Sequence, residues 1–203
     1  MQIETLTDGF HANTYILIQG EEALIIDPAV PTLEMASMVY DKKVIGILLT
    51  HAHFDHFLTL QELMLKSGAP CYLTKKAYAK LTDAEANGSM YFGYLKQFDF
   101  TGCEFKYLSD GKTEQVGSFN FKTIFTPGHT DCSVCFLFDN VIFTGDTLFQ
   151  DGVGRTDLPT GSWLVLKQSL KQLMKLPGNL VVYPGHGDST TIEEESLNNP
   201  YCK

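Results

Sequence analysis

The stretch THAHFDH, residues 50–56, holds three of the six histidines of this 203-residue chain. It directly follows the apolar run 44–49, which predicts a strand buried on both faces. Alternate side chains of an extended segment point the same way, so His51, His53 and Asp55 can converge. If a helix begins near Asp55, His56 turns back onto the same point. Three imidazoles and a carboxylate suit a borderline divalent metal such as zinc.

Three further ligand-type side chains follow predicted strands, each beside a glycine that lets backbone approach a site closely. His129 lies in TPGHT (126–130), Asp146 in TGDT (144–147) and His186 in PGHG (184–187). Four loops at strand ends therefore supply seven candidate metal ligands. They are His51, His53, Asp55, His56, His129, Asp146 and His186.

Strand-like apolar runs recur in both halves of the chain, which predicts a two-halved β core covered by helices and one domain over residues 1–203. These runs are residues 14–19, 23–26, 44–49, 105–107, 119–125, 133–138, 141–143 and 180–183. The first two, separated by Gly20-Glu21-Glu22, predict a hairpin, and Asp139-Asn140 predicts a tight turn between 133–138 and 141–143. Helical patterns begin at Pro31 and near Asp55, the second ending at Gly68. A third helical face comprises Trp163, Leu166, Leu170, Leu173 and Leu176, with Pro177-Gly178 as its stop.

The formal charge is 15 − 24 = −9, which argues against nucleic acid or an anionic membrane as the partner. The sequence has no apolar run long enough to span a bilayer and no signal peptide at its start, so we expect a cytoplasmic protein. Cys132 and Cys135 lie around a predicted strand, and we interpret them as core or surface cysteines rather than a redox or zinc pair.

The ordered motifs resemble the metallo-β-lactamase superfamily and, within it, the glyoxalase II-type hydroxyacylglutathione hydrolases in their short, single-domain bacterial form. They are THAHFDH (50–56), TPGHT (126–130), TGDTLF (144–149), GRTD (154–157) and YPGHG (183–187), with further likeness at 13–15, 26–28 and 199–201. The resemblance implies an α+β fold, a four-layer αββα sandwich with a dinuclear metal site at one edge of the β core.

The resemblance also implies roles for the seven ligands. His51, His53 and His129 would bind one metal ion, Asp55, His56 and His186 a second, and Asp146 would bridge them. Two dications lower the pKa of a bridging water, and the resulting hydroxide attacks a carbonyl carbon. Asp55 and Asp146 are the expected catalytic carboxylates. The implied cofactors are two divalent ions, with Zn²⁺ preferred and iron or manganese left open.

The substrate implied by the resemblance is a small hydroxyacyl thioester such as S-lactoylglutathione, cleaved by metal-bound hydroxide. A bridging Asp146 favours this type over the lactamases, which lack a carboxylate bridge. The helical C-terminal domain that holds glutathione in typical members is not expected here, so another thiol carrier or ester stays open. One alternative is a persulfide dioxygenase with a single iron held by His51, His129 and Asp146. A non-catalytic metal-binding module is the other.

Three residues beside the ligand loops are candidates for substrate binding. Arg155, the sole arginine, either clamps a carboxylate of the substrate or, as we slightly favour, forms a structural ion pair with Asp157 or Asp151. Phe149 and Tyr183 either line the pocket or pack into the core.

Two further features keep two interpretations each. Asp27, before Pro28, either orients a ligand histidine or forms a turn. The aromatic-rich segment 74–104 either forms a lid or wall over a pocket or packs onto the core. The expected partner is the small-molecule thioester, and the sequence leaves the oligomeric state open.

Overall fold

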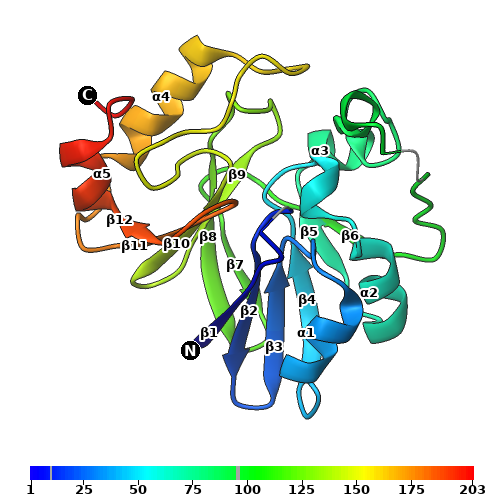
Figure 1. Ribbon diagram of the computed structural model, residues 1–203. Helices are drawn as coiled ribbons and strands as arrows, with labels where there is room; N and C mark the ends of the chain where they lie inside the picture. Colours follow the sequence, from blue (N-terminus) through cyan, green and yellow to red (C-terminus); the bar gives the residue numbers. More distant parts are fainter. Residues whose placement is uncertain (10, 95–96) are drawn as a thin grey trace. The chain divides into compact units, whose positions relative to one another are not determined.

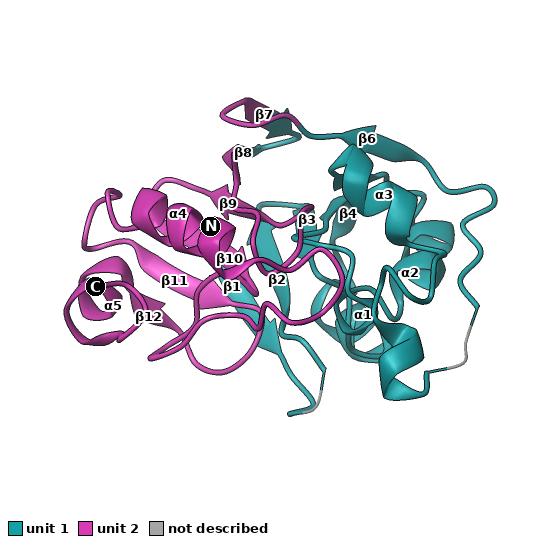
Figure 2. Ribbon diagram, turned by 90° about the horizontal axis from the view of Figure 1, so that it is seen from above, with its two compact units in different colours: residues 1–108, 115–120 teal, residues 109–114, 121–203 magenta. Residues whose placement is uncertain are grey.

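The computed structural model describes residues 1–9, 11–94 and 97–203. Residues 95–96, which belong to the aromatic segment 74–104, lie outside the described residues. The chain divides into two compact units, coloured separately in Figure 2. The first comprises residues 1–108 and 115–120, and the second residues 109–114 and 121–203. A single domain over residues 1–203 stays a prediction.

The first unit contains a six-stranded mixed sheet in chain order, β1 to β6 (Figure 1). The strands are β1 (Gln2–Leu6), β2 (Thr14–Gln19), β3 (Glu22–Ile26), β4 (Lys43–Leu48), β5 (Cys71–Leu73) and β6 (Phe105–Tyr107). β1, β2 and β3 pair antiparallel, which confirms the predicted hairpin, and β3 to β6 pair in parallel. Ile26 lies opposite Leu48, so the segments after β3 and β4 leave the sheet side by side.

The helices of the first unit are α1 (Thr32–Met38), α2 (Leu60–Ser67), α3 (Lys75–Lys80) and the 3₁₀ turns η1 (Phe54–His56) and η2 (Ser89–Phe92). Pro31 precedes α1 and Gly68 ends α2, as predicted. The helix expected from Asp55 is instead interrupted between η1 and α2. The backbone groups that a continuous helix would pair are bonded elsewhere, since the Thr59 amide donates to the Pro28 carbonyl and the Asp55 carbonyl accepts from the Ala12 amide.

The second sheet has the order β12-β11-β10-β9-β8-β7 and is also mixed. Its strands are β7 (Thr113–Val116), β8 (Phe119–Phe125), β9 (Val134–Leu137), β10 (Val141–Gly145), β11 (Val181–Pro184) and β12 (Thr190–Thr191). The predicted turn at Asp139-Asn140 joins the antiparallel pair β9 and β10. β10 and β11 run parallel, so the segments after both strands emerge at the same end.

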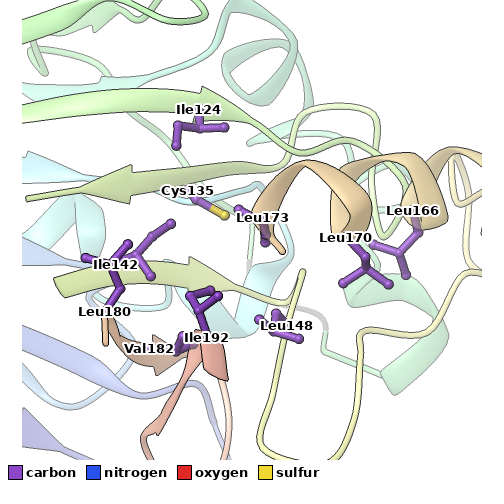
Figure 3. Close-up of a cluster of buried hydrophobic side chains, with 10 residues drawn as sticks. All are labelled: Ile124, Cys135, Ile142, Leu148, Leu166, Leu170, Leu173, Leu180, Val182 and Ile192. Carbon is purple, nitrogen blue, oxygen red and sulfur yellow. The ribbon is translucent and has the colours of Figure 1, made fainter. Parts of the chain in front are cut away.

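The second unit also carries α4 (Trp163–Leu173) and α5 (Ile192–Asn198). Leu166, Leu170 and Leu173 of α4 are buried as predicted, whereas Trp163 is half-exposed and the helix ends before Leu176. The three leucines join a buried cluster with residues of β8 to β11 (Figure 3). Its members are Ile124, Cys135, Ile142, Leu148, Leu166, Leu170, Leu173, Leu180, Val182 and Ile192.

In the described residues, none of the helices has the length and apolar character that a membrane crossing requires. All five cysteines are free thiols, and Cys132 and Cys135 are buried, as expected for core cysteines. Burial raises the pKa of the Cys135 thiol to about 12, which keeps it protonated and makes it a poor metal ligand.

Candidate metal centre

The loop after β4 gathers the candidate ligands of the first unit. His51, His53 and His56 are all buried. His51 Nε2 lies 3.2 Å from His53 Nδ1, and the rings of His51 and His56 have their centroids 4.1 Å apart. Ligand atoms of Asp55 and His56 lie within 4.8 Å of one another. The four residues predicted from THAHFDH therefore converge within this unit.

Asp27 orients two of these histidines. Its buried carboxylate accepts hydrogen bonds from the Thr50 backbone amide (2.8 Å), the Thr50 hydroxyl (2.6 Å) and His56 Nδ1 (2.8 Å). Because the Thr50 hydroxyl donates to Asp27, it is an acceptor for His51 Nδ1, 3.2 Å away. Both rings therefore carry their proton on Nδ1 and present Nε2 as the metal-binding atom.

The backbone at Asp27 shows why both interpretations of this residue hold. Its φ of 49° lies in the left-handed region, so Asp27 does form a turn before Pro28. That turn also points the carboxylate at the loop after β4, because the Asp27 amide donates to the Leu48 carbonyl at 3.0 Å. The hydrogen bond to His56 is the contact that the predicted orienting role requires, and metal binding by His56 stays a prediction.

The second unit brings its three candidates together at the ends of β8, β10 and β11. Asp146 Oδ2 lies 3.5 Å from His129 Nε2 and 3.6 Å from His186 Nε2. The opposite side of the His129 ring is fixed, since His129 Nδ1 donates to the Arg155 carbonyl at 2.7 Å. One carboxylate oxygen therefore lies close to both imidazoles, so the three candidate ligands converge within this unit.

Gly154 supports this arrangement in a way that the sequence motif alone did not reveal. A Cβ at residue 154 would lie 2.0 Å from the Asp146 carbonyl oxygen and 2.8 Å from His129 Nδ1. Contacts this short are impossible, so only glycine lets the GRTD loop pass against both ligands. The GRTD loop thus packs its backbone against Asp146 and His129, and its Arg155 carbonyl accepts the hydrogen bond from His129.

The donor atoms fit divalent metal ions. Two nitrogen ligands of a tetrahedral zinc, each about 2.0–2.1 Å from the ion, are about 3.3 Å apart. The 3.2 Å between His51 Nε2 and His53 Nδ1 is close to that separation, as are the distances around Asp146 Oδ2. Imidazole and carboxylate donors suit zinc, iron and manganese.

Arg155 forms the structural ion pair that we slightly favoured from the sequence. Its Nε and Nη2 donate to Asp157 Oδ1 at 2.7 Å and Oδ2 at 2.6 Å. These hydrogen bonds lower the pKa of the exposed Asp157 carboxyl to about 2. Binding of a substrate carboxylate by Arg155 stays a prediction, and it requires the guanidinium to leave Asp157.

The other two predicted substrate contacts differ from each other. Phe149 lies edge-on to the imidazole of His186, with ring centroids 6.1 Å apart, so it borders a candidate ligand. Tyr183 stacks on the buried ring of Phe143 at 5.2 Å, the contact expected from core packing. Contact of either residue with substrate stays a prediction.

Glu195 holds the loop that carries Phe149, and sequence reasoning missed it. This fully buried carboxylate accepts hydrogen bonds from the Thr190 hydroxyl, the Asp151 amide and the Asn199 side chain. Asn199 also donates to the Gly152 carbonyl at 3.0 Å. The signal for this helix was the sequence Thr191 to Glu194, a capping box whose Thr191 hydroxyl accepts from the Glu194 amide.

Comparison with known proteins agrees with the geometry of the two ligand clusters. The family model described as "Metallo-beta-lactamase superfamily" matches residues 7–186, a range that spans all seven candidate ligands. The chain belongs to the metallo-beta-lactamase superfamily. The superfamily resemblance predicted from the motifs is therefore confirmed.

Two curated relatives match along nearly the whole chain. The probable metallo-hydrolase YqgX of Bacillus subtilis is 37% identical over 196 residues, covering 94% of this chain and 92% of the relative. The hydroxyacylglutathione hydrolase GloC of Haemophilus influenzae is 30% identical over 208 residues, covering 99% and 98%. The chain is therefore a metal-dependent hydrolase of this superfamily.

Solved structures agree on the fold. BLEG-1 B3 metallo-beta-lactamase superposes with a TM-score of 0.88 at 32% identity and covers 100% of both chains. TTHA1623, solved in a di-iron-bound form, superposes with a TM-score of 0.84 at 30% identity, covering 99% of this chain and 100% of its own. The predicted metallo-β-lactamase fold is confirmed.

Proposed function

We propose that the chain is a dinuclear metallohydrolase that cleaves small hydroxyacyl thioesters, such as S-lactoylglutathione. The observation that carries this proposal is that one carboxylate oxygen of Asp146, Oδ2, lies close to both His129 Nε2 and His186 Nε2 within the second unit. The similarity to the hydroxyacylglutathione hydrolase GloC supports the substrate class. The similarity to a di-iron-bound structure supports two metal ions.

In this proposal, His51, His53 and His129 bind one ion, Asp55, His56 and His186 bind a second, and Asp146 bridges the two. Zn²⁺ is the preferred metal, with iron and manganese as alternatives. Two bound dications supply an activated water nucleophile and polarise the thioester carbonyl. Their +4 exceeds the −2 of Asp55 and Asp146, so the site favours negative charge in the transition state.

The chain's own residues prepare this chemistry by fixing protons. Asp27 accepts the proton of His56 Nδ1, and through the Thr50 hydroxyl it fixes that of His51 Nδ1. The Arg155 carbonyl accepts the proton of His129 Nδ1. Each ring is thereby held as a neutral ligand with Nε2 deprotonated, which raises its metal affinity. The small thioester is the proposed partner, in the cytoplasm.

The test combines elemental analysis with hydrolysis of acyl-thiols by the purified protein. The wild type should bind two metals per chain and cleave S-lactoylglutathione or a related thioester. Asp146→Ala should lose metal from both sites and lose hydrolysis, whereas Asp139→Ala, in the exposed β9–β10 turn, should change neither. An Asp146→Ala protein with two metals and full activity would refute the bridging assignment.

The same experiment separates the alternatives. A single iron per chain, sulfite formation from a persulfide and no thioester cleavage would replace the hydrolase proposal by the dioxygenase. The similarity to BLEG-1 B3 metallo-beta-lactamase makes a chromogenic β-lactam a necessary comparison substrate. A preference for the lactam over every thioester would overturn the proposed substrate class.

A further inference from the structure

Three consecutive large apolar side chains are exposed in the first unit. Met90, Tyr91 and Phe92 occupy the 3₁₀ turn η2 and are 56%, 47% and 58% exposed. Single exposed apolar residues are ordinary, but grouped ones cost hydrophobic free energy and commonly mark a binding surface. The aromatic segment therefore does more than pack onto the core.

This turn is attached to the candidate ligands through Phe54, which stands between His53 and Asp55 in the chain. The Phe54 ring lies 5.7 Å from Phe92 and 5.1 Å from Tyr94, centroid to centroid. The Phe54 amide donates to the Asn87 carbonyl at 3.0 Å. The exposed aromatic rings are therefore in direct contact with the loop that carries four ligands.

Gly88 brings the backbone of the turn against a ligand. A Cβ on this residue would touch His53 Cδ2 at 3.5 Å, and its φ of 81° is a conformation that glycine adopts without strain. The turn is then held by the Asn87 side chain, which accepts from the Ser89 amide and donates to the Leu81 carbonyl. The surface is thus built and fixed, and not a loosely attached loop.

The rest of the segment separates into a packed part and an open part. Phe98 is buried, with its ring 4.7 Å from Phe57 and 6.0 Å from Tyr94. A cavity of about 520 Å³ has Met90, Tyr94 and Phe98 in its lining, whereas Phe92 and Phe54 lie outside that lining. This volume falls within the range of sites for small organic molecules. Phe98 therefore packs on the core, Met90 borders the cavity, and Phe92 is exposed beside it.

We propose that Met90, Phe92 and Tyr94, backed by the buried ring of Phe54 and here called together with it the aromatic wall, bind an apolar group of the substrate. This inference rests on the proposed thioesterase function and deepens it. A ring or a branched alkyl chain that covers Phe92 would gain hydrophobic burial and an offset stack. The preferred substrates then carry an apolar group on either the acyl or the thiol side, rather than the small polar lactoyl group alone.

Three simple thioesters test the wall and distinguish the two sides of the substrate. S-methyl thioacetate is the reference, S-benzyl thioacetate carries a ring on the thiol, and S-methyl phenylthioacetate carries it on the acyl group. The wild type should hydrolyse one ring-bearing thioester with a higher kcat/KM than the reference. A preference for S-benzyl thioacetate would show that the wall binds the thiol side of the substrate, and a preference for S-methyl phenylthioacetate would show that it binds the acyl side.

Phe92→Ala should lower the ratio of kcat/KM, ring-bearing to reference, by about fivefold to fifteenfold, mainly through KM, because 58% of the ring is available for burial. Phe92→Leu should retain most of the ratio, since an apolar side chain remains. Tyr40→Ala is the matched control, because Tyr40 is an exposed aromatic (89%) of the same unit outside the wall. It should leave both kcat/KM and the ratio unchanged.

A second measurement keeps the inference testable if none of the three thioesters is hydrolysed. If S-lactoylglutathione is not cleaved either, the proposed function alone is refuted. Titration calorimetry compares S-benzyl-N-acetylcysteine with S-methyl-N-acetylcysteine, neither of which can be hydrolysed as a thioester. The wild type should prefer the benzyl compound by about fivefold or more, and Phe92→Ala should abolish that preference. Equal affinity of the wild type for both probes, or a preference that Phe92→Ala retains, would overturn the inference.

Discussion

Replacing Asp27 by asparagine would reverse the proton positions in two ligand histidines. The asparagine oxygen must accept from the Thr50 amide, which leaves the NH₂ group facing the Thr50 hydroxyl and His56 Nδ1. The NH₂ group and the protonated Nδ1 of His56 would then both be donors facing each other, so the His56 proton moves from Nδ1 to Nε2. The Thr50 hydroxyl turns to accept from the amide and donates to His51 Nδ1, with the same consequence.

The size of the effect follows from this geometry. Loss of the hydrogen-bond partner of a ligand histidine typically costs tenfold to a hundredfold in metal affinity, about 1.4–2.7 kcal/mol. His51 and His56 are assigned to different metal ions, so Asp27→Asn should weaken both sites. The free energy of unfolding of the metal-free protein should fall by about 1–2 kcal/mol, because hydrogen bonds to a charged carboxylate are replaced by neutral ones of about half the strength. Asparagine tolerates the φ of 49°, so the backbone adds little.

The assay is competition with a zinc chelator of known affinity, followed at both sites, with urea unfolding of the metal-free protein alongside. Asp8→Asn is the matched control, because Asp8 also contacts a histidine, His11 Nδ1 at 2.7 Å, at a partly exposed position. It should leave both metal affinities unchanged. If Asp27→Asn bound two zinc ions as tightly as the wild type, the orienting role of Asp27 would be refuted.

Two further predictions concern the loops of the second unit. Gly154→Ala should lower thioester turnover more than tenfold and the free energy of unfolding by about 1–3 kcal/mol, because the new Cβ would collide with the Asp146 carbonyl. Gly152→Ala is the control and should change neither quantity, because a Cβ there has no contact under 3.7 Å. Turnover and thermal melting measure both, and a fully active Gly154→Ala protein would contradict the close approach. Glu195→Gln should lower the free energy of unfolding, measured with urea, by about 1.5–3 kcal/mol, because a buried acceptor is lost. Glu193→Gln, exposed on the same helix, should lower it by under about 0.5 kcal/mol. Equal stability of the two variants would count against the anchoring role of Glu195.

The sequence predicted the ligands well because their signal is local. THAHFDH follows an apolar strand directly, and alternation in an extended segment sends His51 and His53 the same way, as the structure has it. The same holds for the glycine-flanked His129 and His186, which meet Asp146 at the ends of their strands. Strong apolar runs also predicted the hairpin of β2 and β3.

Short elements at the margins were not predicted, because their patterns are brief and depend on tertiary pairing. β1, β7 and β12 are polar at most of their positions, and β5 contains only three residues, so none of the four forms an apolar run like those of the predicted strands. The helix α4 ends at Leu173 rather than near Pro177, since apolar spacing continues past the last helical turn. Phe98 packs inward, as the core-packing interpretation of residues 74–104 predicts, whereas a lid or wall over a pocket stays a prediction.

The supporting contacts were beyond reach because they join positions far apart in sequence. Asp27 and His56 are 29 residues apart, and Arg155 reaches His129 only with its carbonyl. Residue identity says nothing about a carbonyl acceptor, which every residue has. A single sequence can therefore name the ligands and offer Asp27 as a candidate orienting group, but it does not identify a backbone acceptor such as the Arg155 carbonyl.

The pairing of β3 with β4 has a further consequence for how this centre can change. Ile26 lies opposite Leu48, and the next residues along the two strands include Asp27 and Thr50. A shift of one strand by a single residue would reverse the faces of its side chains and separate Asp27 from Thr50. Insertions and deletions within these two strands should therefore abolish metal binding even where the sheet still forms. Loops elsewhere in the first unit, such as that between α1 and β4, are free to vary in length.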